Sequence, residues 1–406
     1  MNAQDSEPSL LLAPDCRLEF DRDHNVTITL DQSRVSLGDL GLPLVDAFRR
    51  PSRISDAMGA IKDRLDSSLA WIDYRRLLSR MQDEGMLVAE GDFQRSAPRA
   101  RGFDAPSIQI AMLDDRRRTK AFIQAIEETI RPGDVVLEIG TGTGVLAAAA
   151  ARAGARRVYA VEQGDIAQAA ERLFYNNRLH DRISLIPGAS TRIELPETAD
   201  VVVGELFGHD PLEENVLESF LDARRRHMKP GGRFLPRSLT LEAIPVRVSR
   251  EILARRRFTE DTLAHWQSDY ALDFSALAAW QALSTAPFLA QPEELPHLHP
   301  CSPPVRFPSI EFDQWDSSIV EFKADLVIDT PGLVNGVMLG FELELNDKLT
   351  LRIDPRANAP DNHWRTPVHL LPSPFALEKG ARCRIQYSFG RASAPSISIV
   401  PLPELP

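Results

Sequence analysis

The stretch from about residue 108 to 236 alternates apolar strands with amphipathic helices, and this pattern limits the possible folds more than any other feature. The strand candidates are "DVVLEI", "RVYAVE", "ISLIPG", "ADVVVGE" and "GRFLP". Between them, "GVLAAAAARAG", "DIAQAAERLFYNN" and "EENVLESFLDARRRHM" have helical spacing. Strands joined through helices lie parallel, because each crossover helix carries the chain back to the same edge. We therefore predict an α/β region with a parallel sheet.

Different patterns flank this region. From about 17 to 92, a β-hairpin turning at His24-Asn25 precedes several short amphipathic helices, which predicts a small α+β, winged-helix-like domain. Residues 93–107 are rich in Pro, Arg, Ser and Ala and are expected to form a linker. After residue 237, alternating segments predict a β-barrel or sandwich that carries a helical insertion at about 250–283. The predicted domains are 1–95, 100–236 and 237–406.

The composition is that of a globular protein, with 406 residues of which 43% are hydrophobic and 26% charged. A net charge of −11 gives no attraction to nucleic acid or to an anionic membrane, whereas an acidic surface could attract a basic peptide. No stretch reaches the roughly 18 apolar residues of a membrane span. Cys16, Cys301 and Cys383 have neither disulfide nor zinc spacing. We expect a soluble, cytoplasmic protein without a metal site.

The sequence "VLEIGTGTG" predicts a nucleotide-like ligand where a strand meets a helix N-terminus. Glycines permit the tight turn and the close approach of a ligand, and Val145 departs from the dinucleotide fingerprint, so S-adenosylmethionine fits better than a nicotinamide or flavin. Glu162 ends the next strand, where a carboxylate could accept both ribose hydroxyls. A purely structural turn and a solvated strand-end acid are the alternatives. The candidate cofactor residues here are Glu138, Gly140, Thr141, Gly142, Gly144 and Glu162.

A second functional pattern is "GELFGHDPLEEN", in which Glu205 directly follows an apolar run and Glu214 comes nine positions later. An acid that ends a buried strand is hard to explain by solvation alone. Glu214 has a simpler alternative, because acids such as Glu213, Glu214 and Glu218 also favour the N-terminus of a helix.

Three stretches, "VLEIGTGTGVLAAAAARAGARRVYAVE", "VVVGELFGHDPLEENVLE" and "KPGGRFLPRSLTL", together resemble the protein arginine methyltransferases, from about residue 100 onward. The resemblance implies a Rossmann-like, class I methyltransferase domain that uses S-adenosylmethionine, followed by a β-barrel. It also implies that Glu205 and Glu214 hold the substrate guanidinium, with Glu205 next to the cofactor as well. Two carboxylates can orient this delocalised, weakly nucleophilic group through bidentate hydrogen bonds.

The resemblance extends to two further segments. In "IQIAMLDDRRRTKAF", Met112 is implied to pack near the transferred methyl group, and Arg118 to pair with the cofactor carboxylate. In "DNHWRTPVHLLPSP", His363 is implied to pair with Asp115, and Trp364 to form a wall of the arginine slot by cation–π contact. The alternatives are a solvated charged face for the arginines and ordinary barrel packing for the His-Trp pair.

Four positions depart from the family pattern or add to it. Phe103 stands where relatives have one of two tyrosines, Asn362 replaces a threonine, and Thr191 replaces an acid that receives the adenine amino group. Thr191 still offers a weaker polar contact to the cofactor. His209 is expected to be an ordinary loop residue rather than a catalytic base.

The helical insertion lies where the resembled family has a dimerisation arm, so Trp266, Tyr270, Leu272 and Phe274 are implied to dock on a partner, or else to cover their own barrel. The N-terminal domain is similar to winged-helix domains that bind a leader peptide as an added strand, and a structural appendage and a protein-docking module are the alternatives. We therefore expect a homodimeric arginine N-methyltransferase that acts on a protein or peptide, with a ribosomal peptide precursor as one candidate substrate. A tailoring methyltransferase with another nucleophile and a non-catalytic binding module are the alternatives.

Overall fold

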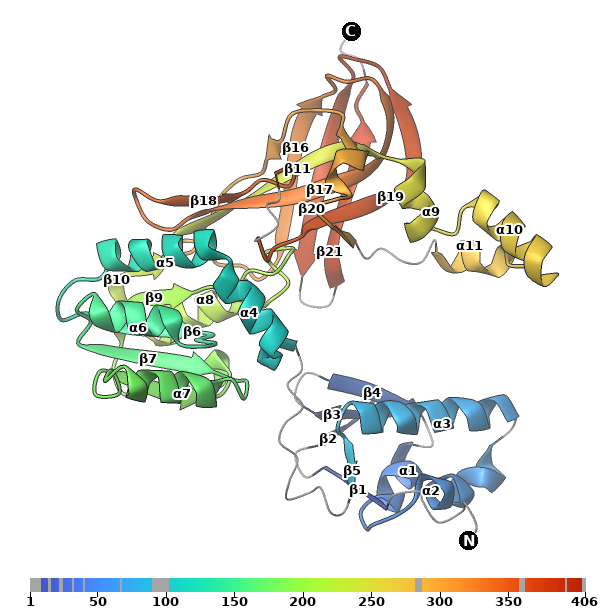
Figure 1. The fold of residues 1–406 in the computed structure, drawn as a ribbon, viewed down its shortest axis with the longest axis horizontal. Coiled ribbons are helices and arrows are strands. Elements are labelled where there is room, and N and C mark those ends of the chain that lie inside the picture. The colour runs from blue at the N-terminus through green and yellow to red at the C-terminus, as the bar shows by residue number, and fades with distance from the viewer. Residues whose placement is uncertain are drawn as a thin grey trace. The chain divides into compact units, whose positions relative to one another are not determined.

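The computed structural model describes residues 9–13, 16–21, 25–30, 33–38, 41–65, 68–89, 102–281, 287–357, 362–390 and 393–403. Contacts divide the chain into two compact units, residues 1–99 and 100–406 (Figure 1). Each unit has its own core.

The first unit contains a three-stranded antiparallel sheet, of order β2-β3-β4, and three α-helices. The predicted hairpin is present, although His24 lies outside the described residues, and β4 extends it to a third strand that the sequence analysis missed. In β4, Val35 and Leu37 are buried while Arg34 and Ser36 are exposed, as the two-residue period of a strand requires. The elements are β1 (Leu10–Leu12), β2 (Arg17–Phe20), β3 (Val26–Leu30), β4 (Ser33–Gly38), α1 (Gly41–Ala47), α2 (Ile54–Ile61), η1 (Lys62–Arg64), α3 (Ser68–Asp83) and β5 (Leu87–Ala89), which pairs with β1.

The second unit begins with a parallel five-stranded sheet, as predicted, and its strand order is β10-β9-β6-β7-β8. Its central strands β6 and β9 are runs of mostly buried β-branched and apolar residues, because helices cover a parallel sheet on both faces. Residues 102–107, predicted as linker, instead form η2 and the start of α4. The elements are η2 (Gly102–Asp104), α4 (Pro106–Asp114), α5 (Arg116–Thr129), β6 (Val135–Ile139), α6 (Val145–Arg152), β7 (Arg157–Glu162), α7 (Ala167–Asn176), β8 (Ile183–Pro187), η3 (Ser190–Arg192), β9 (Ala199–Gly204), α8 (Val216–Arg226) and β10 (Met228–Leu235).

An antiparallel β region follows, as predicted, built from an eight-stranded and a three-stranded sheet. Helices α9 to α11 form an arm, and Figure 1 shows α10 and α11 standing away from these sheets. No described helix is long and apolar enough to cross a membrane. The elements are β11 (Ser238–Val248), α9 (Arg250–Arg256), α10 (Glu260–Tyr270), α11 (Ser275–Gln281), β12 (Phe288–Ala290), η4 (Leu295–His297), β13 (Leu298–Pro300), β14 (Val305–Arg306), β15 (Ile310–Glu311), β16 (Val320–Val327), β17 (Gly332–Glu344), β18 (Thr350–Ile353), β19 (Thr366–Leu377), β20 (Arg382–Gly390) and β21 (Ser393–Pro401).

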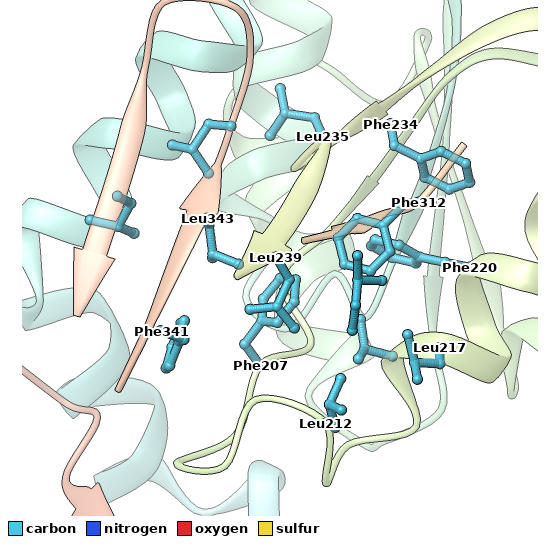
Figure 2. Packing of buried hydrophobic residues seen from close by; sticks show 14 of the residues in the cluster. Phe207, Leu212, Leu217, Phe220, Phe234, Leu235, Leu239, Phe312, Phe341 and Leu343 are labelled. Atoms are coloured by element: carbon cyan, nitrogen blue, oxygen red, sulfur yellow. The ribbon is translucent and has the colours of Figure 1, made fainter. Parts of the chain in front are cut away.

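The parallel sheet and the β region share one hydrophobic core (Figure 2). Phe220 of α8 packs edge-on against Phe312, with ring centroids 4.7 Å apart. The ring centroid of Phe207, from the loop after β9, lies 6.3 Å from that of Phe312 and 6.4 Å from that of Phe341 in β17. This loop, residues 205–215, is therefore held between the two halves of the unit, and it carries both candidate glutamates.

Candidate active site

The turn after β6 has the backbone conformation that only glycine adopts without strain. Gly140, Gly142 and Gly144 have φ angles of 72°, 53° and 86°, and Gly144 directly precedes α6. A Cβ atom at Gly140 would lie 2.6 Å from Leu206, which follows Glu205. The glycine turn and the glutamate loop are therefore in close contact at one edge of the sheet.

Two carboxylates hold the glycine turn in place. Glu138 is buried and accepts a hydrogen bond from the Thr141 hydroxyl, and burial raises its pKa to about 8. Glu162, at the end of β7, accepts hydrogen bonds from the N–H groups of Gly142 and Gly164, each at 2.8 Å. Each carboxylate oxygen of Glu162 still has a second lone pair. The two backbone hydrogen bonds are therefore compatible with the predicted hydrogen bonds from two ribose hydroxyls.

The segment of η2 and α4 lies against this turn. Asp104 accepts a hydrogen bond from the N–H of Ile166 at 2.9 Å, just before α7. Gln109 is buried beside Gly142 and donates to the backbone carbonyl of Phe103 at 2.6 Å. The sequence analysis missed Asp104 and Gln109, because nothing in their local pattern shows which loop they meet. Phe103 itself is half exposed.

Arg118 and Glu205 form a buried ion pair, with side chains only 7% and 8% exposed. Arg118 also donates to the backbone carbonyl of Met112 at 3.0 Å. Among the described residues, two buried atoms of this pair, Arg118 Nε and Glu205 Oε1, have no hydrogen-bond partner. The pair therefore keeps a free donor for a carboxylate and a free acceptor for a cation, which fits both the cofactor and the substrate implied by the sequence.

Glu214 lies at the other end of the loop, close enough to Glu205 for their charges to repel. Burial is the main reason that its pKa rises to about 8, and Glu205 and Glu213 raise it further. Helix α8 begins only at Val216, with Asn215 as its N-cap residue. Glu214 therefore precedes the helix instead of lying in its first turn, which weakens the helix-dipole alternative for this residue.

Contacts from the β region hold α4, α5 and the glutamate loop. The His363 ring lies 3.0 Å from Asp115, which also caps α5 by accepting from the N–H of Arg118. Burial alone would raise the pKa of Asp115, but the hydrogen bonds from His363 and from two backbone N–H groups hold it below its ordinary value. The pairing of His363 with Asp115 is thus as the sequence implied.

Trp364 corrects one expectation. It is 1% exposed, packs edge-on against Phe341 at 5.3 Å, and donates its indole N–H to the backbone carbonyl of Phe207 at 2.6 Å. A ring enclosed in this way cannot offer its face to a substrate, so Trp364 supports the loop instead of lining the slot. Its neighbour Arg365 donates a backbone N–H to His209 Nδ1 at 2.9 Å.

His209 belongs to the glutamate loop, whereas Thr191 belongs to a separate segment after β8. Burial, with His363 and Arg365 nearby, lowers the pKa of His209 to about 4, so its ring is neutral near pH 7. Thr191 lies exposed in η3, after β8, and its role toward an adenine remains a prediction. Within the described ranges, no group of three or more His, Cys, Asp or Glu side chains could hold a metal ion.

Comparisons with known proteins agree with this geometry. Residues 115–241 match the family model of the ribosomal protein L11 methyltransferase, PrmA. Over 248 residues, 58% of the chain, it is 30% identical to a probable protein arginine N-methyltransferase 6 of Arabidopsis thaliana, of which it covers 53%. Over 172 residues, 42% of the chain, it is 36% identical to a probable protein arginine N-methyltransferase 6.1 of Oryza sativa subsp. indica, of which it covers 44%. The chain thus spans about half the length of these curated relatives.

Solved structures show the same fold. The Trypanosoma brucei PRMT1 enzyme–prozyme heterotetrameric complex with AdoHcy matches 74% of this chain and 94% of its own, with a TM-score of 0.63 and 21% identity. Arabidopsis thaliana protein arginine methyltransferase 10 matches 70% of this chain and 88% of its own, with a TM-score of 0.58 and 24% identity. The predicted fold class is confirmed, and the chain is related to the S-adenosylmethionine-dependent methyltransferases.

Proposed function

We propose that this protein transfers a methyl group from S-adenosylmethionine to a guanidino nitrogen of an arginine in a protein or peptide. One observation carries the proposal: two carboxylates, Glu205 and Glu214, share a largely buried loop beside the glycine turn, and Glu205 keeps an unused acceptor atom there. A buried site rich in carboxylates selects a cation, and the planar guanidinium fits two carboxylates through paired hydrogen bonds.

In this proposal, different residues bind the substrate and the cofactor. Glu205 and Glu214 bind the guanidinium and localise its charge away from the attacking nitrogen, which orients that nitrogen for an in-line displacement. The glycine turn and Glu162 hold the cofactor, and Arg118 offers its free Nε to a carboxylate. When bound, S-adenosylmethionine supplies an electrophilic methyl group. Asp115 and His363 tie α5 to the β region and so keep Arg118 in place.

Isotope transfer tests the function. Incubation with methyl-labelled cofactor and arginine-containing peptides should place the label on a guanidino nitrogen, as located by mass spectrometry. Glu205→Gln should lower kcat by roughly a hundredfold or more, because the guanidinium loses its charged partner, while cofactor affinity changes little. The matched control is Glu213→Gln, an acid of the same loop whose side chain is more exposed, which should keep most of the activity.

The rival functions give other results. Label on a different nucleophile would make the protein a tailoring methyltransferase, and cofactor binding without transfer to any acceptor would make it a binding module. An unchanged rate in Glu205→Gln would remove this residue from the mechanism.

We further propose that the protein works as a cytoplasmic homodimer. Cys301 and Cys383 are buried thiols that form no disulfide, which suits a reducing compartment. The arm exposes Tyr270 and Leu272, while the α4 segment exposes Phe103, Ile110 and Leu113. These two apolar surfaces could cover each other between two copies.

The N-terminal unit is proposed to bind part of the substrate, such as the leader segment of a ribosomal peptide. Helix α3 lies beside β4: Arg80 donates to the backbone carbonyl of Arg34 at 3.3 Å, and Tyr74 lies close to Gly38. In the described sheet, β4 pairs only with β3. An extended peptide could therefore add to the outer edge of β4, next to α3.

A further inference from the structure

Asp210 is a buried carboxyl group between the two glutamates, and the proposed chemistry gives it no role. It is only 1% exposed. The Tyr387 hydroxyl lies 2.8 and 3.0 Å from its two oxygens and donates to them. Tyr387 belongs to β20, is fully buried, and packs near Phe307 with ring centroids 6.2 Å apart. A carboxyl group buried on a tyrosine, with no cation beside it in the described structure, needs an explanation.

Asp210 begins the turn that leads to Glu214. Its side chain accepts from the N–H of Leu212 at 3.2 Å, and its backbone carbonyl accepts from the N–H of Glu213 at 3.2 Å. Within the described residues, no hydrogen bond holds the Glu214 carboxyl group itself. The position of Glu214 therefore depends on the backbone of this turn.

The two glutamates are fixed by different parts of the molecule. Glu205 directly follows β9 and pairs with Arg118, so the parallel-sheet region sets its place. The rest of the loop is held from the β region, by Trp364 at Phe207 and by Tyr387 at Asp210. Of these anchors, Tyr387 contacts the residue closest in sequence to Glu214.

We propose that Tyr387 and Asp210 are a positioning pair that sets the place of Glu214 relative to Glu205 and so fits the slot to a guanidinium. The inference rests on the proposed function and deepens it. Reaction rates depend steeply on such geometry, since a misplacement of about 1 Å can cost about a hundredfold. Burial raises the pKa of Asp210 to about 7, and the Tyr387 hydrogen bond opposes this rise. Without the Tyr387 hydroxyl, the buried Asp210 side chain would keep only one hydrogen-bond donor, the backbone N–H of Leu212.

Tyr387→Phe tests the proposal, because it removes one oxygen and leaves the ring packing in place. We expect kcat/KM for an arginine peptide to fall by about tenfold or more, mostly in kcat, with the cofactor Kd within about twofold of wild type. Amide hydrogen exchange measured by mass spectrometry should speed up at residues 210–214. Tyr159→Phe is the matched control, since this hydroxyl also donates to a carboxylate, Glu197, at 3.1 Å but belongs to β7. Tyr159→Phe should leave both kcat/KM and the amide exchange at residues 210–214 unchanged.

A double variant separates positioning from general stability. If Asp210 and Tyr387 act as one unit, Asp210→Leu combined with Tyr387→Phe should lose no more activity than the worse single variant. Activities are compared well below every melting temperature, so a merely structural role predicts unchanged kcat/KM.

The result that overturns the proposal is wild-type kcat/KM in Tyr387→Phe alongside arginine methylation by the wild-type protein. Absence of label from arginine in the wild type overturns the proposed function instead. In that case, amide hydrogen exchange alone tests whether Tyr387 and Asp210 position the loop. Unchanged exchange at residues 210–214 in Tyr387→Phe would overturn this positioning role as well.

Discussion

Glu214 is a carboxyl group whose surroundings favour its protonated form. Its pKa of about 8 comes first from burial and then from the repelling charges of Glu205 and Glu213. A neutral carboxyl binds a guanidinium far more weakly than a carboxylate does. Under the proposed function, an arginine substrate therefore has to displace a proton from the free protein near pH 7.

This proton gives a pH dependence with a definite sign. Because the pKa of Glu214 is raised, the carboxylate form grows as pH increases, and kcat/KM for an arginine peptide should rise and then level off above about pH 8. Steady-state rates from pH 6 to 9 measure this. Glu214→Gln should lack the rise and remain slow throughout. Glu213→Gln should keep the rise but at slightly lower pH, because one repelling charge is gone. A flat wild-type profile would contradict the assignment.

Single residues show where sequence reasoning stops. Glu205, Glu214 and Glu162 could be selected from sequence because Glu162 ends a readable strand and the other two lie in the loop directly after another. The burial of Trp364 could not, because it depends on Phe341 and on a carbonyl at Phe207, 157 residues away. The Asp210–Tyr387 contact spans 177 residues and has no local signal at all.

At the scale of elements, the proposed peptide-binding edge formed by β4 and α3 of the first unit can be tested separately. Trp71 is 43% exposed and stands one turn before Tyr74 on the same side of α3, so a peptide added to β4 would meet it. Trp71→Ala should weaken binding of the full-length substrate by about tenfold, as measured by fluorescence anisotropy. Ile72→Ala, an equally exposed neighbour on another side of the helix, should bind normally.

Two results would count against this docking edge. Trp71→Ala could bind the substrate as the wild type does, or a short arginine peptide without any extension could bind as tightly as the full-length substrate.

The elements themselves were largely predictable. Alternation of period two and helical spacing identified the parallel sheet, its helices and the β region after residue 237, because burial on one or both faces determines these patterns. The strand β4 was missed, since its pattern "SRVSLG" contains only two large apolar residues, Val35 and Leu37. The start of α4 was read as linker because Pro106 and Ser107 are also common in loops, although proline equally favours the first turn of a helix.

At the scale of the whole molecule, the proposed homodimer predicts the molecular mass of the protein in solution. The wild type should sediment at twice 45.2 kDa. Leu272→Asp should yield monomers, because a charge in an apolar contact is costly to bury. Val327→Asp replaces a similarly exposed apolar residue of β16, away from the arm, and should leave the dimer intact. A wild type that sediments at 45.2 kDa would exclude the dimer at the concentration used.

The glutamate loop at 205–215 is anchored to Tyr387, which the ribosome adds 177 residues after Asp210. During synthesis, the strands of the parallel sheet emerge well before β20, so the glutamate loop reaches its last anchor only when most of the chain has been made. A prematurely terminated product that lacks β20 would leave Asp210 without Tyr387 and would interrupt the core that the two halves of the unit share.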